Sequence, residues 1–259
     1  FRYLRNVWKR NTEEEALLGV SLTGICDHHV LSSDSPQLEK WLTEMKDVAV
    51  KTNKKWAAKL GINQSAAITC VKPSGTVSQL VDSASGIHPR FSNHYIRRVR
   101  SDKKDPLAQY METVGFPVEP DVMNKSSLVF SFPVKAPAKS VVVKDVGAME
   151  QLKLWKKYQD FWCEHKPSIT VYYTDDEFLQ VAQWIWDNFD TVSGISLLPV
   201  SDHVYQQAPY EAIDKEKYKE LVKAMPKDID WTDLENFEKD DNTTGSQELA
   251  CTGGACEIV

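Results

Sequence analysis

The sequence predicts an α/β fold, in which strands and helices alternate along most of the chain. Two observations support this prediction. Short apolar runs bounded by turn residues recur from residue 67 onward, and segments with apolar residues at helical spacing lie between them. Alternation of this kind is typical of largely parallel sheets whose strands are connected by helices. With 259 residues and 42% hydrophobic content, the chain is long enough to bury a sizeable core.

The first 61 residues are expected to be mainly helical. Apolar side chains recur at helical spacing over residues 1–10, and Thr12 followed by Glu15 is a capping-box pattern that predicts a new helix start. The segment LLGVSLTGI, residues 17–25, is expected to be buried and interrupted by two glycines. Residues 37–60 repeat apolar positions at helical spacing, and the glycine that follows is expected to end this helix.

Strands and helices then alternate as far as residue 200. The expected strands are residues 67–71, 94–100, 127–134, 168–174 and 194–200. The expected helices are residues 105–115, with Asp105 as the cap, then residues 147–165 and the segment DDEFLQVAQWIWDNF. From about residue 235 the chain is acidic and then polar, which predicts a flexible arm.

Composition excludes several classes of function. A net charge of −6 argues against a protein built mainly to grip a nucleic-acid backbone, although it leaves room for a small phosphorylated ligand. No uncharged apolar run approaches the roughly 18 to 20 residues of a membrane span, and the basic, aromatic start FRYLRNVWKR is not a secretory signal. Five irregularly spaced cysteines favour a reducing, cytoplasmic location.

The stretch AITCVKPSGTVSQL, residues 67–80, is a candidate phosphate-binding loop. An apolar strand runs into Lys-Pro-Ser-Gly-Thr and then into an expected helix start. Backbone N–H groups, hydroxyl donors and a glycine at such a turn suit phosphate binding, and Lys72 adds a charge. An ordinary strand-to-helix turn with a Ser or Thr cap is the alternative from spacing alone. The pattern is not that of a P-loop.

The chain ends in two cysteines, Cys251 and Cys256, with two glycines between them. Thiols this close can form a disulfide at little loop-closure cost. The pair therefore suits a thiol–disulfide shuttle carried on a flexible tail. A disordered tail with incidental cysteines and half of a zinc site are the alternatives, although no second ligand pair stands nearby.

Several motifs in a common order carry a resemblance to a known family. KPSGT is followed by VDSASGIHPRFSNHYIRRVR, preceded by GVSLTGI, and succeeded by DPLAQYMETVGFPVEPDV, FPVK, SLLP, QQAPYEAI and the Cys-x4-Cys tail. Together they resemble the adenosylcobalamin-dependent (class II) ribonucleotide reductases, and most closely the monomeric triphosphate reductase type. Nearly the whole chain lies under this resemblance.

The resemblance implies a fold and a division of the chain. Family members have a ten-stranded α/β barrel assembled from two five-stranded halves, so residues 1–234 are expected to form the C-terminal half-barrel and residues 235–259 a redox-shuttle tail. In this reading the tail pair, Cys251 and Cys256, re-reduces the active site and then exchanges with thioredoxin or a similar dithiol. The phosphates of a ribonucleotide would be held by Pro73, Ser74, Gly75, Thr76, Val77 and Ser78.

The resemblance also places cobalamin-contacting segments at about residues 88–145 and from about 205 through the 230s. The candidate cofactor-binding residues are His88, Arg97, Arg98, Gln206, Gln207 and Pro209. Both regions are equally compatible with surface and fold, and His88 with a structural turn. The run Cys26-Asp27-His28-His29 lacks partner ligands at useful spacing, so no metal site is expected. Cys70 and Cys163 are expected to be packing residues.

The Asn-x-Cys-x-Glu finger that carries the thiyl-radical cysteine in this family does not occur in the sequence. The leading hypothesis is therefore the C-terminal part of an adenosylcobalamin-dependent reductase of ribonucleoside triphosphates or diphosphates, working with an N-terminal part on a second chain. Two other hypotheses stay open: a non-catalytic nucleotide-binding module derived from the reductase, and a thiol-redox protein that uses the tail.

Overall fold

The computed structural model describes residues 5–75, 77–200 and 206–238. These residues form two compact units. Unit 1 draws on residues 1–93 and 136–202, and unit 2 on residues 94–135 and 203–259. The chain thus leaves unit 1 to build a sheet, returns to complete unit 1, and leaves again. Across the described residues, no helix is long and apolar enough to cross a membrane.

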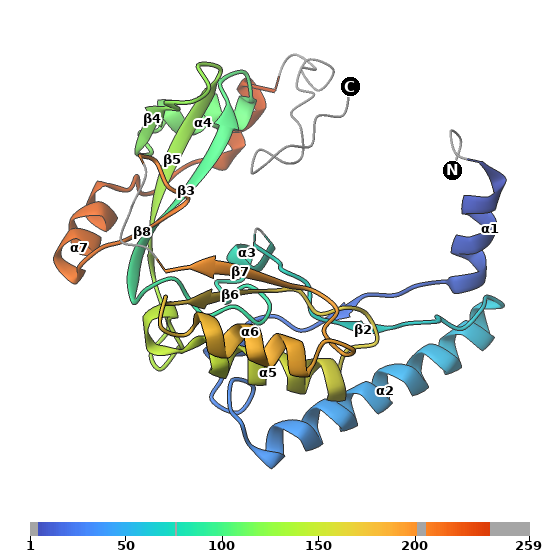
Figure 1. Cartoon of the computed structure of the whole chain (residues 1–259). Helices are drawn as coiled ribbons and strands as arrows, with labels where there is room; N and C mark the ends of the chain where they lie inside the picture. The colour runs from blue at the N-terminus through green and yellow to red at the C-terminus, as the bar shows by residue number, and fades with distance from the viewer. Residues whose placement is uncertain (1–4, 76, 201–205, 239–259) are drawn as a thin grey trace. The chain divides into compact units, whose positions relative to one another are not determined.

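Unit 1 combines helices with two short pairs of parallel strands (Figure 1). Strand β1 (Val20–Ser21) pairs with β2 (Thr69–Cys70), and β6 (Ile169–Tyr173) pairs with β7 (Ile195–Pro199). The helical elements are α1 (Asn6–Glu15), η1 (Ile25–Asp27), α2 (Pro36–Leu60), α3 (Val77–Leu80), η2 (Val143–Asp145), α5 (Ala148–Phe161) and α6 (Phe178–Asp187). The parallel pairing agrees with the expected α/β class.

Helix α5 occupies the centre of unit 1, where it contacts α2, α6 and β6 (Figure 1). Its buried face includes Leu152, Trp155 and Tyr158, which pack against Leu42 of α2 and Val171 of β6. The indole Nε1 of Trp155 donates to the carbonyl of Pro167, so the one polar atom of this buried ring is satisfied. This core fixes the strands whose ends carry the candidate phosphate loop.

The ends of the two best-patterned helices follow their sequence signals. In α2 the Ser35 hydroxyl accepts from the Leu38 amide, and Gly61 closes the helix in the left-handed region at φ 67°. In α4 (Pro106–Thr113) the Asp105 carboxylate accepts from the Leu107 amide, as expected. The end expected at Gly61 and the cap expected at Asp105 are confirmed, and both depend on interactions that are local in the sequence.

The expected helix start at Thr12 is wrong. Thr12 lies inside α1, where its hydroxyl donates to the carbonyl of Trp8 instead of capping a new helix. The expected burial of residues 17–25 is also wrong for most of that segment. Leu17, Leu18 and Val20 are 52%, 46% and 43% exposed, whereas Ile25 is fully buried.

Unit 2 is a four-stranded sheet in the order β4-β5-β3-β8. Its strands are β3 (His94–Asp102), β4 (Val118–Pro120), β5 (Ser127–Lys135) and β8 (Tyr210–Ala212), with α4, α7 (Lys215–Ala224) and η3 (Trp231–Asn236). Every pairing in this sheet is antiparallel, which differs from the largely parallel arrangement expected from alternation. Between β3 and β5 the chain passes through α4 and β4, and β4 also pairs antiparallel with β5.

A buried ion pair ties three segments of unit 1 together. Two guanidinium nitrogens of Arg90 donate to the two carboxylate oxygens of Asp27, at 3.0 and 2.9 Å. Asp27 also accepts from the Ala84 amide and from the Ser140 hydroxyl. A third guanidinium nitrogen, Nη1, donates to the Asp82 carboxylate at 3.0 Å.

Burial works to raise the pKa of the Asp27 carboxyl, but these hydrogen bonds and the guanidinium charge more than offset it, so the pKa is lowered below its ordinary value. The carboxylate therefore stays ionised opposite Arg90.

We predict that Asp27→Ala lowers the free energy of unfolding by about 3 kcal/mol, because it leaves a guanidinium that is 2% exposed without its main partner. Urea denaturation of the full chain measures the effect. Glu13→Ala is the matched control, since it breaks an exposed pair with Lys9 and should change stability by less than about 1 kcal/mol. Equal effects of the two substitutions would contradict the structural role given to the Asp27 pair.

Candidate functional site

The candidate phosphate loop lies between β2 and α3 in unit 1. Pro73 and Val77 are exposed, Ser74 and Gly75 are partly buried, and Ser78 is buried. Thr76 lies outside the described residues. The hydroxyl of Ser78 donates to the Ser74 carbonyl, which also accepts from the Ser78 amide. Ser78 therefore holds the turn from inside.

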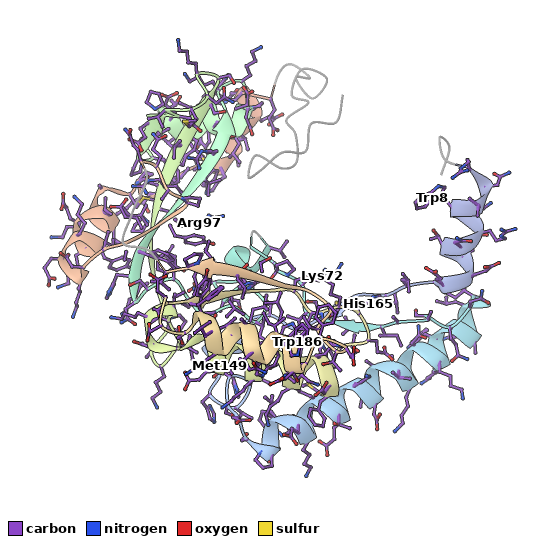
Figure 2. The ribbon with its side chains drawn as sticks, in the orientation of Figure 1. Trp8, Lys72, Arg97, Met149, His165 and Trp186 are labelled. Carbon is purple, nitrogen blue, oxygen red and sulfur yellow. The ribbon has the colours of Figure 1, made fainter. Side chains whose placement is uncertain are left out.

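Two amides of the loop are already engaged within it. The Ser74 amide donates to the Lys72 carbonyl, and the Gly75 amide donates to the Pro73 carbonyl, each at 2.9 Å. In this conformation the side chain of Lys72 is a group that the loop can offer to an anion, whereas the Ser74 hydroxyl is hydrogen-bonded to Thr23. Lys72 is exposed and takes part in none of the ion pairs found among the described residues (Figure 2).

A second loop, residues 83–86, supports the phosphate loop from behind. Gly86 has φ 55°, and a Cβ atom added there would lie 2.5 Å from the Lys72 carbonyl oxygen. Its amide donates to the Thr23 hydroxyl at 2.9 Å, and that hydroxyl is also 2.9 Å from the Ser74 hydroxyl. The two loops therefore touch both through backbone and through one threonine.

His88 lies just beyond this support with both ring nitrogens engaged. Nδ1 is 2.9 Å from the Ser85 carbonyl, so it carries the proton, and Nε2 accepts from the Thr170 amide of β6 at 2.9 Å. Burial lowers the pKa of His88, and the hydrogen bond to Ser85 opposes that shift without cancelling it. The neutral imidazole thus connects the supporting loop to the sheet.

Arg97 and Arg98, both candidate cofactor ligands, lie on β3 in unit 2 (Figure 2). The Arg97 guanidinium lies over the Tyr210 ring, 4.5 Å from its centroid, and its buried Nε has no hydrogen-bond partner. Arg98 donates to the Ala208 carbonyl and to Glu211, although its Nε is likewise without a partner. Buried donors left unsatisfied are uncommon and call for an explanation.

The segment QQAP, residues 206–209, contacts Arg98 although the two are far apart in the sequence. Gln206 is exposed, but the Gln207 side-chain amide is engaged at both ends, since its nitrogen donates to the Pro120 carbonyl and its oxygen accepts from the Val122 amide. The Pro209 carbonyl accepts from the backbone of Arg98. Gln207 and Pro209 therefore hold β3 and the β4 turn in place.

The cysteines fall into two groups. The tail pair, Cys251 and Cys256, lies outside the described residues. Cys26, Cys70 and Cys163 are buried and unpaired in unit 1. Burial is the main cause that raises the pKa of both the Cys26 and the Cys163 thiols to about 12. The expected packing role of Cys70 and Cys163 agrees with their burial.

Comparison with known proteins gives a consistent result. No protein-family model matches the chain. The adenosylcobalamin-dependent ribonucleoside-triphosphate reductase of Lactobacillus acidophilus is 31% identical over 217 residues, which is 81% of this chain and 29% of the relative. The protein of the same name from Lactobacillus helveticus is 28% identical and covers 98% of this chain and 37% of the relative. The Euglena gracilis protein is 30% identical over 228 residues.

This chain is a partial homologue of the adenosylcobalamin-dependent ribonucleotide reductases. It spans about a third of the length of the curated relatives that it matches. A crystal structure of a B12-dependent class II ribonucleotide reductase has the same fold, with a TM-score of 0.74 at 23% identity over 93% of this chain and 36% of that one. The resemblance read from the sequence motifs is thereby confirmed.

Sequence reasoning missed three residues that organise the candidate phosphate loop and its support. Asp27 belongs to the run that was considered for metal binding, and Thr23 lies in an apolar segment. Arg90 lies two residues after the candidate His88. The usable signal was Arg90, because a buried arginine almost always requires a carboxylate partner. Nothing in the local sequence marks Asp27 or Thr23 as its neighbours.

We predict that Gly86→Ala destabilises the chain by about 2 kcal/mol, since a methyl group there meets the Lys72 carbonyl oxygen at a left-handed backbone position. Gly75→Ala is the matched control, because a Cβ at that position meets no described atom within 4 Å. It should change the free energy of unfolding by less than about 0.5 kcal/mol. Thermal and urea unfolding of both variants measure this, and similar losses would contradict the described packing.

We also predict a pH effect from His88. Its folded-state pKa is lowered, while the unfolded value is near 6.5. As pH falls below about 6.5 the unfolded chain takes up a proton that the folded chain excludes, so stability is full above this range and declines below it. Between pH 7 and 5 the wild type should therefore lose more unfolding free energy than His88→Gln, which keeps a donor and an acceptor. Parallel curves would contradict the neutral, structural imidazole.

Proposed function

We propose that the chain is the C-terminal part of an adenosylcobalamin-dependent ribonucleotide reductase. In the overall reaction a ribonucleotide and a dithiol give a 2′-deoxyribonucleotide, a disulfide and water. The agreement of fold over 93% of the chain with a class II reductase, together with the sequence relatives, carries this proposal. A ribonucleoside triphosphate is the proposed substrate because the matched relatives are named for it.

The proposed role of residues 73–78 is to hold the substrate's phosphates. Support comes from the position of the loop at the end of a buried strand and from Lys72, whose ammonium has no acidic partner among the described ion pairs. The close approach of Gly86 to the Lys72 carbonyl limits how far the loop can shift. The chain would thus position the nucleotide without supplying the radical cysteine.

The described residues of unit 2 fit a role in holding adenosylcobalamin. Two buried donors support this fit, because Arg97 Nε and Arg98 Nε have no hydrogen-bond partner. The cofactor carries amide and phosphate oxygens that could accept such bonds. When bound, the cofactor supplies radical initiation by homolysis of its cobalt–carbon bond. Arg97 would donate to it while Tyr210 keeps the guanidinium oriented. Gln207 and Pro209 would act by holding β3, and Gln206 of the same unit remains a candidate contact. In unit 1, His88 is a candidate by sequence alone, since both of its ring nitrogens are already engaged.

The tail pair, Cys251 and Cys256, is proposed to carry electrons to the active site and to be re-reduced by thioredoxin or a similar dithiol in a reducing cytoplasm. Cys26 and Cys163 of unit 1 are poor alternatives, because burial raises the pKa of each thiol to about 12, which leaves almost no thiolate for exchange. A thiol-redox protein acting independently of a reductase would also not account for the fold similarity.

An N-terminal part that carries the radical cysteine is the proposed partner, and one surface of unit 1 suits it. Among the described residues, β7 pairs with β6 alone, and Leu197, Leu198 and Val200 on or beside it are 38%, 47% and 52% exposed. On α6, Leu179 and Trp186 are 77% and 76% exposed (Figure 2). Parallel strands with exposed apolar residues are normally covered. The solved relative has nearly two thirds of its chain beyond this match, which is long enough to include such a covering segment.

The proposal predicts turnover only when the chain is combined with a partner that contains an Asn-x-Cys-x-Glu finger. Reduction of ribonucleoside triphosphate, with adenosylcobalamin and a thioredoxin system, is measured by product chromatography. Cys251→Ser should abolish thioredoxin-coupled turnover and preserve a single turnover, because the shuttle acts only after the first disulfide forms. Cys70→Ser is the control for loss of a cysteine outside the tail.

Two outcomes would contradict the proposal. A complex that binds nucleotide without any turnover would favour the non-catalytic module. A Cys251→Ser enzyme with unchanged multiple turnover would remove the tail from the electron path while leaving the rest of the reductase proposal in place.

A further inference from the structure

The hydroxyl of Thr23 forms an unusually complete set of hydrogen bonds for an exposed side chain. It donates to the Ala84 carbonyl at 3.0 Å and accepts from the Gly86 amide at 2.9 Å. It is also 2.9 Å from the Ser74 hydroxyl of the phosphate loop, 51 residues away in sequence. A hydroxyl has one proton and two acceptor positions, so these three bonds use all of them.

The proton count determines which way the Ser74 hydroxyl points. While Thr23 donates to the Ala84 carbonyl, the bond between the two hydroxyls requires Ser74 as donor. Ser74 then presents lone pairs, and not a proton, to any group that approaches the loop. An anionic oxygen would be repelled by that arrangement.

A second arrangement is available without moving a heavy atom. The Ala84 carbonyl also accepts from the Gly24 amide at 2.8 Å, so it stays satisfied if the Thr23 proton rotates away. Thr23 can then donate to Ser74, and Ser74 can turn its own proton outward. The chain of donors would run from the Gly86 amide through Thr23 and Ser74 to the anion, each bond polarising the next.

We propose that Thr23 is a positioning residue that reorients the Ser74 hydroxyl, as seen by the ligand, from acceptor to donor when a phosphate oxygen binds beside Ser74. The inference rests on the proposed function for its ligand, and it adds a residue outside the loop to the determinants of phosphate affinity. The series of hydrogen bonds begins at the Gly86 amide, which can only donate. The two hydroxyls that follow, those of Thr23 and Ser74, can therefore both donate in the direction of the anion.

The test measures the binding of inorganic tripolyphosphate to the full chain by titration calorimetry and by ³¹P NMR. Ser74→Ala should weaken binding about tenfold, as expected for loss of one hydrogen bond to a charged group. Thr23→Val should weaken it about fivefold, and Thr23→Ser should restore it to within about twofold of wild type. Thr23→Ala serves if the valine variant does not fold.

The double variant separates positioning from mere support of the fold. In the Ser74→Ala background Thr23→Val should have no further effect on binding, although it can still lower the unfolding temperature. An equal loss in both backgrounds, or unchanged binding in Thr23→Val alone, would overturn the proposed role of Thr23. Wild-type protein that does not bind tripolyphosphate would overturn the phosphate site itself, which distinguishes the two failures.

Discussion

The arrangement of unit 1 depends on the charge of one buried arginine. The Arg90 side chain is 2% exposed, and a guanidinium in that environment is destabilising by several kcal/mol unless carboxylates face it. Asp27 supplies both of its oxygens, and Asp82 supplies a carboxylate and a carbonyl. Because the guanidinium donors form a rigid planar fork, these partners are held at fixed angles as well as distances.

This constraint passes directly to the phosphate loop. Asp82 follows α3 and pairs with Arg90, and the Ala84 amide donates to Asp27, so the first part of the supporting loop is anchored to the ion pair at two points. Gly86 then passes against the Lys72 carbonyl at a distance that excludes any side chain. The position of the loop is therefore set by a charge interaction about 60 residues apart in sequence, in addition to its own turn residues.

The sequence was informative wherever the decisive interactions are local. The bounds of α2 and α4 follow from Ser35, Gly61 and Asp105, each of which acts within four residues of itself. The start expected at Thr12 failed because a threonine hydroxyl can equally bond the preceding turn of an uninterrupted helix. The antiparallel pairing of β3 with β5 was missed because alternation of strands and helices specifies the order of elements but not strand direction.

The same limit applies to the site. The motif at residues 72–80 located the loop, and the family resemblance suggested phosphate binding as its role. The hydrogen bonds of the Ser74 and Gly75 amides could be seen only in three dimensions. His88 was a candidate cofactor contact by its position in the sequence, and its hydrogen bonds with Ser85 and Thr170 could not be read from that position. Pairings such as Thr23 with Ser74 leave no periodic signal, because they join two loops.

The burial of Cys26 and Cys163 bears on the proposed thiol–disulfide exchange through the tail, because it determines whether these two thiols can react. With a pKa near 12, roughly one thiol in 10⁵ is ionised at pH 7, and exchange rates scale with that fraction. A disulfide that approached unit 1 during the proposed reaction would find the thiols of Cys26 and Cys163 protonated and therefore unreactive. Burial thus protects Cys26 and Cys163 from disulfide exchange, so these two thiols would not compete with the proposed route through the tail cysteines.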